Sequence, residues 1–355
     1  MNIHWPPQPR YALEGCGGIF SEEKSRSDER QDGAGSDMDV IVLAGGFGTR
    51  LRPWTESIPK PLLPILDKSM IEHVVEVLPE SQVDRVLIAA GYGIEKMRTH
   101  FANIPLPYEV EIIEETEPLG TGGAIANCRD HLSGGTFCVI NGDLITSLRV
   151  EEMLDFHRSN GGIGTISLWE VEDPSRFGVA DYRPETGKIM RFQEKPPIEE
   201  AFSNLINAGT YILEPGIFEL MPNGAHSIER DIYEDLAETG GLNGFPFDGW
   251  FVDAGTPRSF VEATKVCISE GRFSSGSVSG DSWFGKDSKN LGVVTGSSVG
   301  SMSIVGEGSA ISDSVILDGV EVGAGSKLND CLVGKGARIP EGTIMAGEIV
   351  GHYVQ

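Results

Sequence analysis

The sequence predicts an α/β protein of two domains: a Rossmann-like, mostly parallel sheet, followed by a short left-handed parallel β-helix. Two patterns predict these domains. Short β-rich runs alternate with helical runs from residue 38 to about residue 270, as in parallel sheets covered by helices. Small aliphatic residues then recur every six positions from Val299 onward, in three sets separated by one-residue slips, which is typical of a parallel β-helix. With 355 residues, the chain can bury a substantial core in each domain.

The first 37 residues stand outside this pattern. They mix Pro, Gly, Ser and charged residues without periodicity, so we expect a disordered tail or a mis-assigned start. Met38 and Asp39 lead directly into the apolar run VIVLAG. Met38 is therefore an alternative initiator, which the intact mass of the native protein would test.

Residues 38–270 are expected to form the sheet domain. Its first part has predicted strands at 40–45, 83–91, 108–115 and 136–143, alternating with predicted helices at 69–80, 95–103, 121–132 and 150–160. Ser69 and Glu72 have the spacing of a capping box at the start of the first helix. After residue 160 a hairpin-like run at 177–196 precedes a helical run at 228–240, which indicates a mixed sheet in the second half.

The C-terminal repeats are expected to follow a linker at 271–290, because residues 273–289 are rich in Ser and Gly. Residues 291–355 would then form about three turns of the β-helix. A flexible Gly/Ser-rich tail is the alternative, but it would not keep a six-residue aliphatic period. The expected inward-facing positions are Val299, Val305, Ile311, Leu317, Val322, Leu328, Val333, Ile339 and Met345.

Composition excludes several classes of partner. The formal charge is −25, and such a surface repels nucleic acid and anionic lipid headgroups. No apolar run approaches the length that spans a bilayer. The five cysteines contain no CxxC pair and suggest no metal site. We therefore expect a protein of the reducing cytoplasm that binds neither nucleic acid nor membrane.

The segment LAGGFGTRLRP, residues 43–53, points to an anionic ligand. Its glycines follow the first strand, at the end of the sheet where α/β proteins bind ligands. Glycines allow backbone N–H groups to approach an anion closely. Arg50, Arg52 and Lys60 then bring three cations against the single acid Glu56. A polyphosphate is the expected ligand.

These residues also resemble the signature of the sugar-1-phosphate nucleotidyltransferases, whose fold is GT-A-like. The resemblance continues in order through EPLGTGGA at 117–124, NGD at 141–143, FGV at 177–179, EKP at 194–196, NAGTYIL at 207–213 and WFVDAGTP at 250–257. The hexapeptide repeats match the architecture of the same family. Within the family, residues 171–220 are most similar to mannose-1-phosphate guanylyltransferases.

The resemblance implies a reaction between a nucleoside triphosphate and a sugar 1-phosphate that releases pyrophosphate. It implies catalytic roles for Arg50, Lys60 and Lys195. Asp143 and Asp253 would hold Mg²⁺, which prefers carboxylates together with phosphate oxygens. The nucleophile is a phosphate oxygen, so no general base is needed.

The remaining expected contacts also follow from the resemblance. The nucleotide would lie against Leu43, Gly45, Gly46, Gly48, Thr49, Gly120 and Thr121. The sugar phosphate would contact Gly178, Glu194, Lys195 and Asn207. Taken alone, Glu194 and Lys195 could equally be an exposed ion pair on a hairpin, which is worth little to stability.

Several functions remain open from the sequence. The favoured substrates are GTP and mannose 1-phosphate, and the close alternative is thymidylyl or uridylyl transfer to glucose 1-phosphate. An inactive regulatory paralogue and a nucleotide-sensing protein are the alternatives from other classes. The end of a short β-helix needs a cover, so we expect the repeats to build a homo-oligomer.

Overall fold

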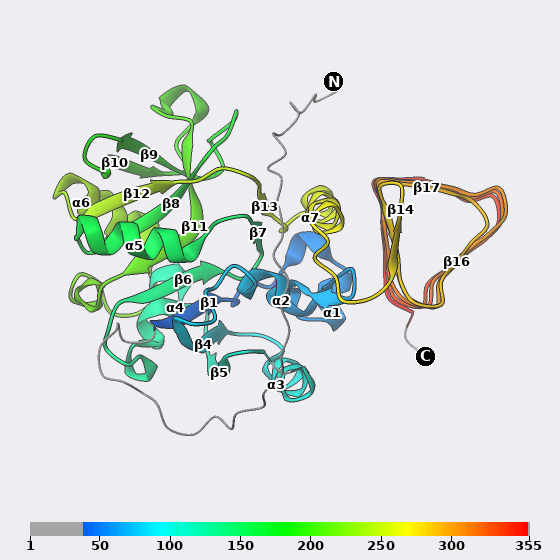
Figure 1. The fold of residues 1–355 in the computed structure, drawn as a ribbon, viewed down its shortest axis with the longest axis horizontal. Coiled ribbons are helices and arrows are strands. Elements are labelled where there is room, and N and C mark those ends of the chain that lie inside the picture. The colour runs from blue at the N-terminus through cyan, green and yellow to red at the C-terminus, as the bar shows by residue number, and fades with distance from the viewer. Residues whose placement is uncertain (1–37, 105, 354–355) are drawn as a thin grey trace, which may run out of the picture. The chain divides into compact units, whose positions relative to one another are not determined.

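A computed structural model describes residues 38–104 and 106–353. The predicted tail, residues 1–37, lies outside the described residues, and the alternative initiator Met38 is the first residue that the structure describes. The first domain is built on a nine-stranded sheet (Figure 1). In order across the sheet, its strands are β5 (Glu109–Glu114), β4 (Val83–Ala90), β1 (Met38–Leu43), β6 (Phe137–Asn141), β11 (Leu205–Leu213), β8 (Gly164–Glu170), β12 (Leu242–Pro246), β10 (Lys188–Glu194) and β9 (Gly178–Arg183).

The predicted change from a parallel to a mixed sheet is confirmed. Strands β5, β4, β1 and β6 are parallel, whereas β11 runs antiparallel to both β6 and β8. Two small strand pairs lie outside the main sheet: β2 (Pro64–Ile65) with β3 (Lys68–Ser69), and β7 (Leu144–Thr146) with β13 (Phe251–Asp253).

Helices bury both faces of the sheet. The α-helices are α1 (Trp54–Ser57), α2 (Met70–Val75), α3 (Ile94–Asn103), α4 (Gly120–Asn127), α5 (Val150–Asn160), α6 (Glu234–Glu238) and α7 (Pro257–Ser269). Val40 and Val42 of β1 pack in one buried cluster with residues of α2, α3 and α5. Ile41 packs in another cluster, with residues of α4 and α6. Burial on both faces accounts for the continuous apolar run of β1.

Helix α2 begins as predicted and ends earlier. The Ser69 N–H donates to Glu72 Oε2 at 2.7 Å, and the capping box is complete. The sequence pattern predicted a helix to residue 80, but α2 ends at Val75, and the Leu78 N–H bonds back to the Val75 carbonyl in a turn. Pro79 explains why the helix does not continue to residue 80, because the residue before a proline, here Leu78, disfavours helical backbone.

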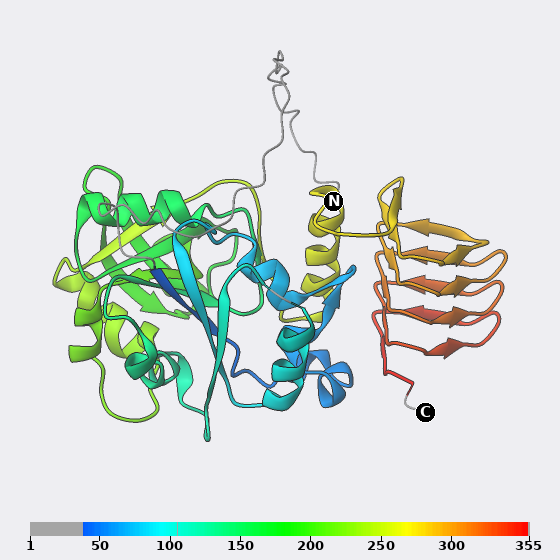
Figure 2. The ribbon, with the colours of Figure 1, turned by 60° about the horizontal axis from the view of Figure 1, so that its bottom comes forward.

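The second domain is a parallel β-helix with a triangular cross-section (Figure 1), whose coils stack along its axis (Figure 2). One wall contains β15 (Ser282–Phe284), β18 (Ser298–Val299), β21 (Val315–Ile316), β24 (Leu332–Val333) and β27 (Ile349–Val350), with β14 (Ser277–Ser279) antiparallel at its end. The second contains β16 (Lys289–Asn290), β19 (Ile304–Val305), β22 (Glu321–Val322) and β25 (Arg338–Ile339). The third contains β17 (Val293–Thr295), β20 (Ala310–Ser312), β23 (Lys327–Asn329) and β26 (Ile344–Ala346).

The β-helix also begins earlier than its predicted start at residue 291. Residues expected in the 271–290 linker form β14, β15 and β16, and the last two pair with the following coil. Trp283 anchors this segment, because its side chain is buried and its Nε1–H donates to the Ser275 carbonyl at 3.1 Å. In the described part, two walls have four strands each, more than the three turns expected.

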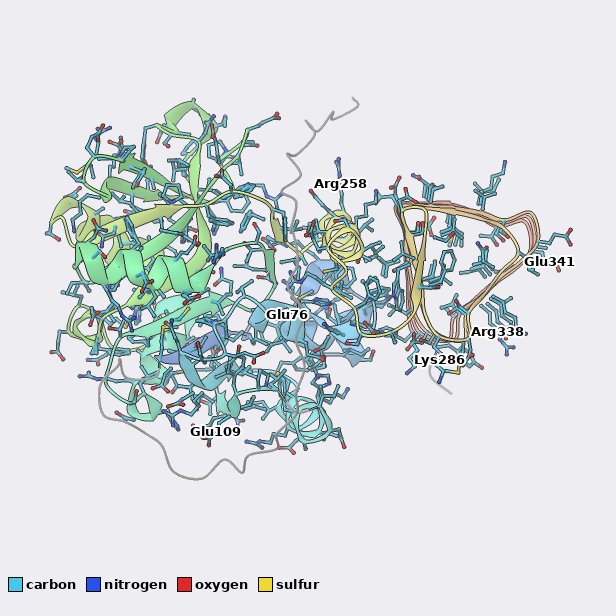
Figure 3. All side chains as sticks on the ribbon, viewed as in Figure 1. Glu76, Glu109, Arg258, Lys286, Arg338 and Glu341 are labelled. Carbon is cyan, nitrogen blue, oxygen red and sulfur yellow. The ribbon has the colours of Figure 1, made fainter. Side chains whose placement is uncertain are left out.

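One predicted ladder position is wrong. Ser298 pairs with Val315, which pairs with Leu332, and equivalent atoms lie 17 residues apart along the chain. One side of each coil is therefore one residue shorter than the hexapeptide period. Ile316, and not Leu317, consequently occupies the β-helix core. Leu317 faces the other way. The side chains of Lys286, Arg338 and Glu341 project outward from the walls (Figure 3).

Leu317 belongs to a buried cluster that joins the two domains, which we call the junction cluster. Trp54 and Phe260 of the sheet domain pack there with Trp283, Leu317 and Leu332 of the β-helix. The Trp54 Nε1–H donates to the Val350 carbonyl at 2.8 Å. The segment that follows the glycine-rich loop is therefore held directly by the last strand of the β-helix.

Candidate active site

The candidate site is a cavity of about 580 Å³ at the carboxyl ends of β1 and β6. β1 and β6 are neighbours in the sheet, and the sheet continues from β1 to β4 on one side and from β6 to β11 on the other. The strand order therefore reverses between β1 and β6. Open α/β sheets bind ligands at such a point. The cavity is lined by Leu43, Ala44, Gly45, Gly46, Phe47, Arg50, Lys60, Pro61, Glu115, Pro118, Leu119, Gly120, Thr121, Ala124, Asn141, Gly142, Asp143 and Lys195.

The glycine-rich loop forms one wall of the cavity. Gly48 has a φ of 60°, and a Cβ there would lie 2.8 Å from Thr55 Cγ2, so the tight turn requires glycine. The Thr55 hydroxyl donates to the Gly48 carbonyl at 2.9 Å. Gly45 and Gly46 line the cavity directly, whereas Gly48 and the following Thr49 lie outside its lining.

Lys60, Asp143 and Asp253 meet at one corner of the site. The Lys60 ammonium donates a hydrogen bond to Asp143 Oδ2. A Cβ built on Gly255 would lie 2.7 Å from Asp253 Oδ1, 3.2 Å from Lys60 Nζ and 3.6 Å from Asp143 Oδ2. Pairing of β7 with β13 brings the two aspartates together, since Asp143 precedes β7 and Asp253 ends β13.

The electrostatics of this corner suit a divalent cation. Burial raises the pKa of Asp253, and the neighbouring Asp143 charge raises it further, while Lys60 and Arg50 oppose the shift. A cation between the two carboxylates would relieve their repulsion. Mg²⁺ often takes only one or two carboxylates and completes its shell with phosphate oxygens and water. Residues 38–104 and 106–353 bring no three His, Cys, Asp or Glu side chains together as a metal site, so two carboxylates are what the chain offers here.

The hairpin of β9 and β10 presents Glu194 and Lys195. Gly178 pairs with Glu194 across the hairpin, and Lys195 Nζ donates to Glu194 Oε1 at 2.5 Å. Burial raises the pKa of Glu194, and the hydrogen bond from Lys195 opposes this shift. Lys195 lines the cavity with a side chain that is 54% exposed, so its ammonium is available to a ligand. Gly178 and Glu194 lie outside the lining.

Gly120 and Thr121, which were predicted to lie against the nucleotide, also line the cavity. Gly120 has a φ of 70°, and a Cβ there would lie 2.5 Å from the His226 carbonyl oxygen. That carbonyl accepts the Gly122 N–H at 3.0 Å. The loop is therefore packed against residues far along the chain, and a larger residue than glycine would displace it.

A buried carboxylate that sequence reasoning missed connects the two halves of the site. Glu229 accepts the Thr121 hydroxyl at 2.5 Å on Oε2 and the Tyr211 hydroxyl at 3.3 Å on Oε1. Tyr211 in turn accepts the Asn207 amide at 3.0 Å. Asn207, a predicted sugar contact, thus reaches the cavity through this network and does not line it. In the sequence Glu229 is one acid of the helical run 228–240 and has no distinguishing signal.

Glu115 is the second residue that sequence reasoning missed. Its carboxylate lines the cavity and is buried. Its place five residues before Gly120, directly after a strand, is the only sequence signal. The lining also contains predicted residues from four separate segments: Leu43, Gly45, Gly46, Arg50, Lys60, Gly120, Thr121, Asp143 and Lys195.

Comparison with known proteins identifies the family of this chain. The family model described as nucleotidyl transferase matches residues 39–270. The chain belongs to the nucleotidyl transferase family. A second model, described as the GlmU-like C-terminal hexapeptide, matches residues 260–349, which agrees with the β-helix. No helix in the described ranges is long and apolar enough to cross a membrane.

The relatives include several sugar-phosphate enzymes. Mannose-1-phosphate guanylyltransferase 1 of Arabidopsis thaliana is 35% identical over 320 residues, which cover 88% of this chain and 86% of the relative. HddC of Yersinia pseudotuberculosis is 32% identical, with a TM-score of 0.55 over 64% of this chain and 99% of that one, and its structure is also known complexed with GMP-PN. A putative glucose-1-phosphate thymidylyltransferase of Bacillus anthracis is 28% identical, with a TM-score of 0.59 over 64% and 94% of the two chains.

Proposed function

We propose that this nucleotidyltransferase joins GTP to mannose 1-phosphate, giving GDP-mannose and pyrophosphate. The observation that carries the proposal is the convergence of Arg50, Lys60 and Asp143 on one cavity at the carboxyl edge of the sheet. The cations suit a triphosphate, and the carboxylate corner suits its metal ion. The guanylyltransferase relatives support the choice of guanine and mannose.

In this reaction an oxygen of the sugar phosphate attacks the α-phosphorus of the triphosphate, and the bond to pyrophosphate breaks. The attacking oxygen is already ionised at neutral pH, because the second phosphate pKa is about 6. Catalysis then consists mainly of positioning and charge neutralisation. Lys195 would hold the sugar phosphate, Lys60 the transferred phosphate, and Arg50 the departing pyrophosphate.

Asp143 and Asp253 would hold Mg²⁺, since they form the carboxylate corner beside Lys60. When bound, the ion neutralises negative charge on the phosphates. The Lys60 ammonium also offsets negative charge at this corner, because it forms an ion pair with Asp143.

Transfer of a thymidylyl or uridylyl group to glucose 1-phosphate is the second candidate function. The Bacillus anthracis relative favours it. Mannose and glucose differ only in the orientation of one hydroxyl. The chemical type of no single cavity residue distinguishes the two sugars. An inactive regulatory subunit is less well supported, because the cavity and its carboxylate corner retain Arg50, Lys60, Asp143, Lys195 and Asp253.

The test is a matrix of five nucleoside triphosphates against several sugar 1-phosphates, followed by pyrophosphate release. GTP with mannose 1-phosphate should give the highest kcat/KM. A preference of more than tenfold for dTTP or UTP with glucose 1-phosphate would replace the proposal with the second candidate. No release with any pair would favour the regulatory or nucleotide-sensing alternatives.

We further propose a cytoplasmic homo-oligomer assembled through the β-helix. The last strands of its walls, β25, β26 and β27, pair on one side only in the described residues. A second copy would cover such unpaired edges, and the side chain of Ile344 on the outer face of β26, which is 77% exposed, adds apolar surface beside them. The buried cysteines Cys128, Cys138, Cys267 and Cys331 are free, in keeping with a reducing compartment.

A further inference from the structure

Two charged groups of the candidate site, Arg50 and Asp253, are carried by backbone that is anchored in the junction cluster. Arg50 is followed directly by Leu51 in the chain. Asp253 lies between Val252 and Ala254. All three apolar neighbours are buried in the junction cluster, which side chains of the β-helix complete. The β-helix therefore supports the floor of a site whose ligands it does not touch.

Trp54 makes the direct link to the last coil of the β-helix. Its side chain is fully buried, and its Nε1–H donates to the Val350 carbonyl at 2.8 Å. The His352 ring stacks on the indole, with the ring centres 5.6 Å apart. A Cβ built on Gly351 would lie 3.2 Å from Pro53 Cγ. Three consecutive residues at the end of the β-helix thus hold Pro53 and Trp54.

The same segment fixes the turn that carries Arg50. Thr55, the residue after Trp54, donates its hydroxyl to the Gly48 carbonyl at 2.9 Å. The Leu51 N–H donates to the same carbonyl, also at 2.9 Å. Within the ranges that the structure describes, no hydrogen bond or ion pair fixes the Arg50 guanidinium itself. Its placement therefore depends on this turn, and a displacement of Trp54 would move it.

We propose that Trp54 is a positioning residue, through which the last coil of the β-helix sets the place of Arg50 at the pyrophosphate end of the cavity. This inference rests on the proposed function, in which Arg50 neutralises the departing pyrophosphate. The indole N–H is the specific element, because a hydrogen bond fixes a direction and apolar packing alone does not. Groups in a catalytic site must be held to about 0.5 Å by such supporting contacts.

The test uses the reverse reaction of the full chain, in which pyrophosphate and GDP-mannose give GTP and mannose 1-phosphate. Trp54→Phe keeps an aromatic ring and removes the N–H donor. It should raise KM for pyrophosphate about fivefold and leave KM for GDP-mannose nearly unchanged, because Arg50 would contact only the pyrophosphate. A role in stability alone would lower the amount of active protein and move neither KM.

Trp283→Phe is the matched control. Trp283 is buried in the same cluster, but its Nε1–H donates to the Ser275 carbonyl at 3.1 Å, within the segment that begins the β-helix. The substitution removes an equivalent donor without releasing Trp54, so it should change neither KM. His352→Ala is the second variant, since it removes the stacked ring and leaves the sheet domain intact. It should raise KM for pyrophosphate about threefold.

Two outcomes would overturn the role of Trp54. One is an unchanged KM for pyrophosphate in Trp54→Phe or, where that variant does not fold, in His352→Ala. The other is an equal rise in Trp283→Phe, which would show a general loosening of the junction cluster. Failure of the proposed function is distinguishable from both, because the unmodified protein itself would then not convert GDP-mannose.

Discussion

Lys60, Asp143 and Asp253 form a compact charged corner, in which each group depends on the others. Asp143 pairs with Lys60, and its charge contributes to the raised pKa of Asp253. The substitution Asp143→Asn removes one charge while keeping the size of the side chain. We expect kcat to fall at least a hundredfold, a barrier increase of about 2.7 kcal/mol, measured by pyrophosphate release. Asp248→Asn is the control, since Asp248 is exposed outside the cavity.

Removal of divalent ions tests the same corner without a substitution. Excess EDTA should abolish turnover, because triphosphate and carboxylate charges would then face one another unscreened, and added Mg²⁺ should restore it. Full activity in EDTA would contradict a metal role for Asp143 and Asp253.

Substitutions of Lys195 and Arg50 should change different kinetic constants. Lys195→Ala should raise KM for the sugar 1-phosphate about tenfold or more and leave KM for the triphosphate nearly unchanged, because its proposed partner is the incoming phosphate. Arg50→Ala should mainly lower kcat, by about a hundredfold, because its proposed role is to neutralise charge where pyrophosphate departs. Steady-state kinetics with each substrate varied will distinguish them. Equal effects on triphosphate affinity would show that the two subsites are misassigned.

At the scale of elements, Glu76 joins the end of α2 to the segment after α7. It accepts hydrogen bonds from Lys68 Nζ and Arg272 Nε, each at 2.6 Å (Glu76 is labelled in Figure 3). Burial raises the pKa of Glu76, but hydrogen bonds from His73 and Lys68 and the charge of Arg272 together lower it to about 2. The contribution of Glu76 to stability is therefore present above its ordinary pKa of 4.5 and is lost as the pH falls toward 2.

Glu76→Gln should consequently lower Tm at pH 7 by about 2–4 °C. The difference from the unmodified protein should shrink below pH 4.5 and disappear near pH 2. Thermal unfolding followed by circular dichroism between pH 2 and pH 7 will measure it. Glu262→Gln on α7 is the control, since Glu262 is exposed. A Tm difference that is constant with pH would exclude an ionic origin.

At the scale of the whole molecule, the junction cluster makes the two domains interdependent. A chain of residues 38–270 keeps the cavity-lining residues but exposes Trp54 and Phe260, both fully buried in the full chain. We expect its Tm to be lower by roughly 10 °C or more.

Light scattering on the same chain of residues 38–270 should show a monomer if the repeats build the oligomer. Assembly identical to that of the full chain would assign the interface to the sheet domain.

The sequence by itself determined the features that local patterns encode. The apolar run of β1, the capping box of Ser69 and Glu72, the glycine-rich loop and the repeat domain all follow from residues close together in the chain. Their physical basis is also local: backbone conformation, periodic burial and short-range hydrogen bonds.

Only the tertiary structure decided which side chains meet. Asp143 and Asp253 come together because β7 pairs with β13, and Glu229 reaches Thr121 from a distant segment. The tertiary structure also decided which residues of the β-helix face its core. Each coil has 17 residues, so Ile316 lies inside the β-helix and Leu317 packs in the junction cluster with Trp54. Burial and charge depend on partners that folding supplies from elsewhere in the chain, so spacing within one segment does not specify them.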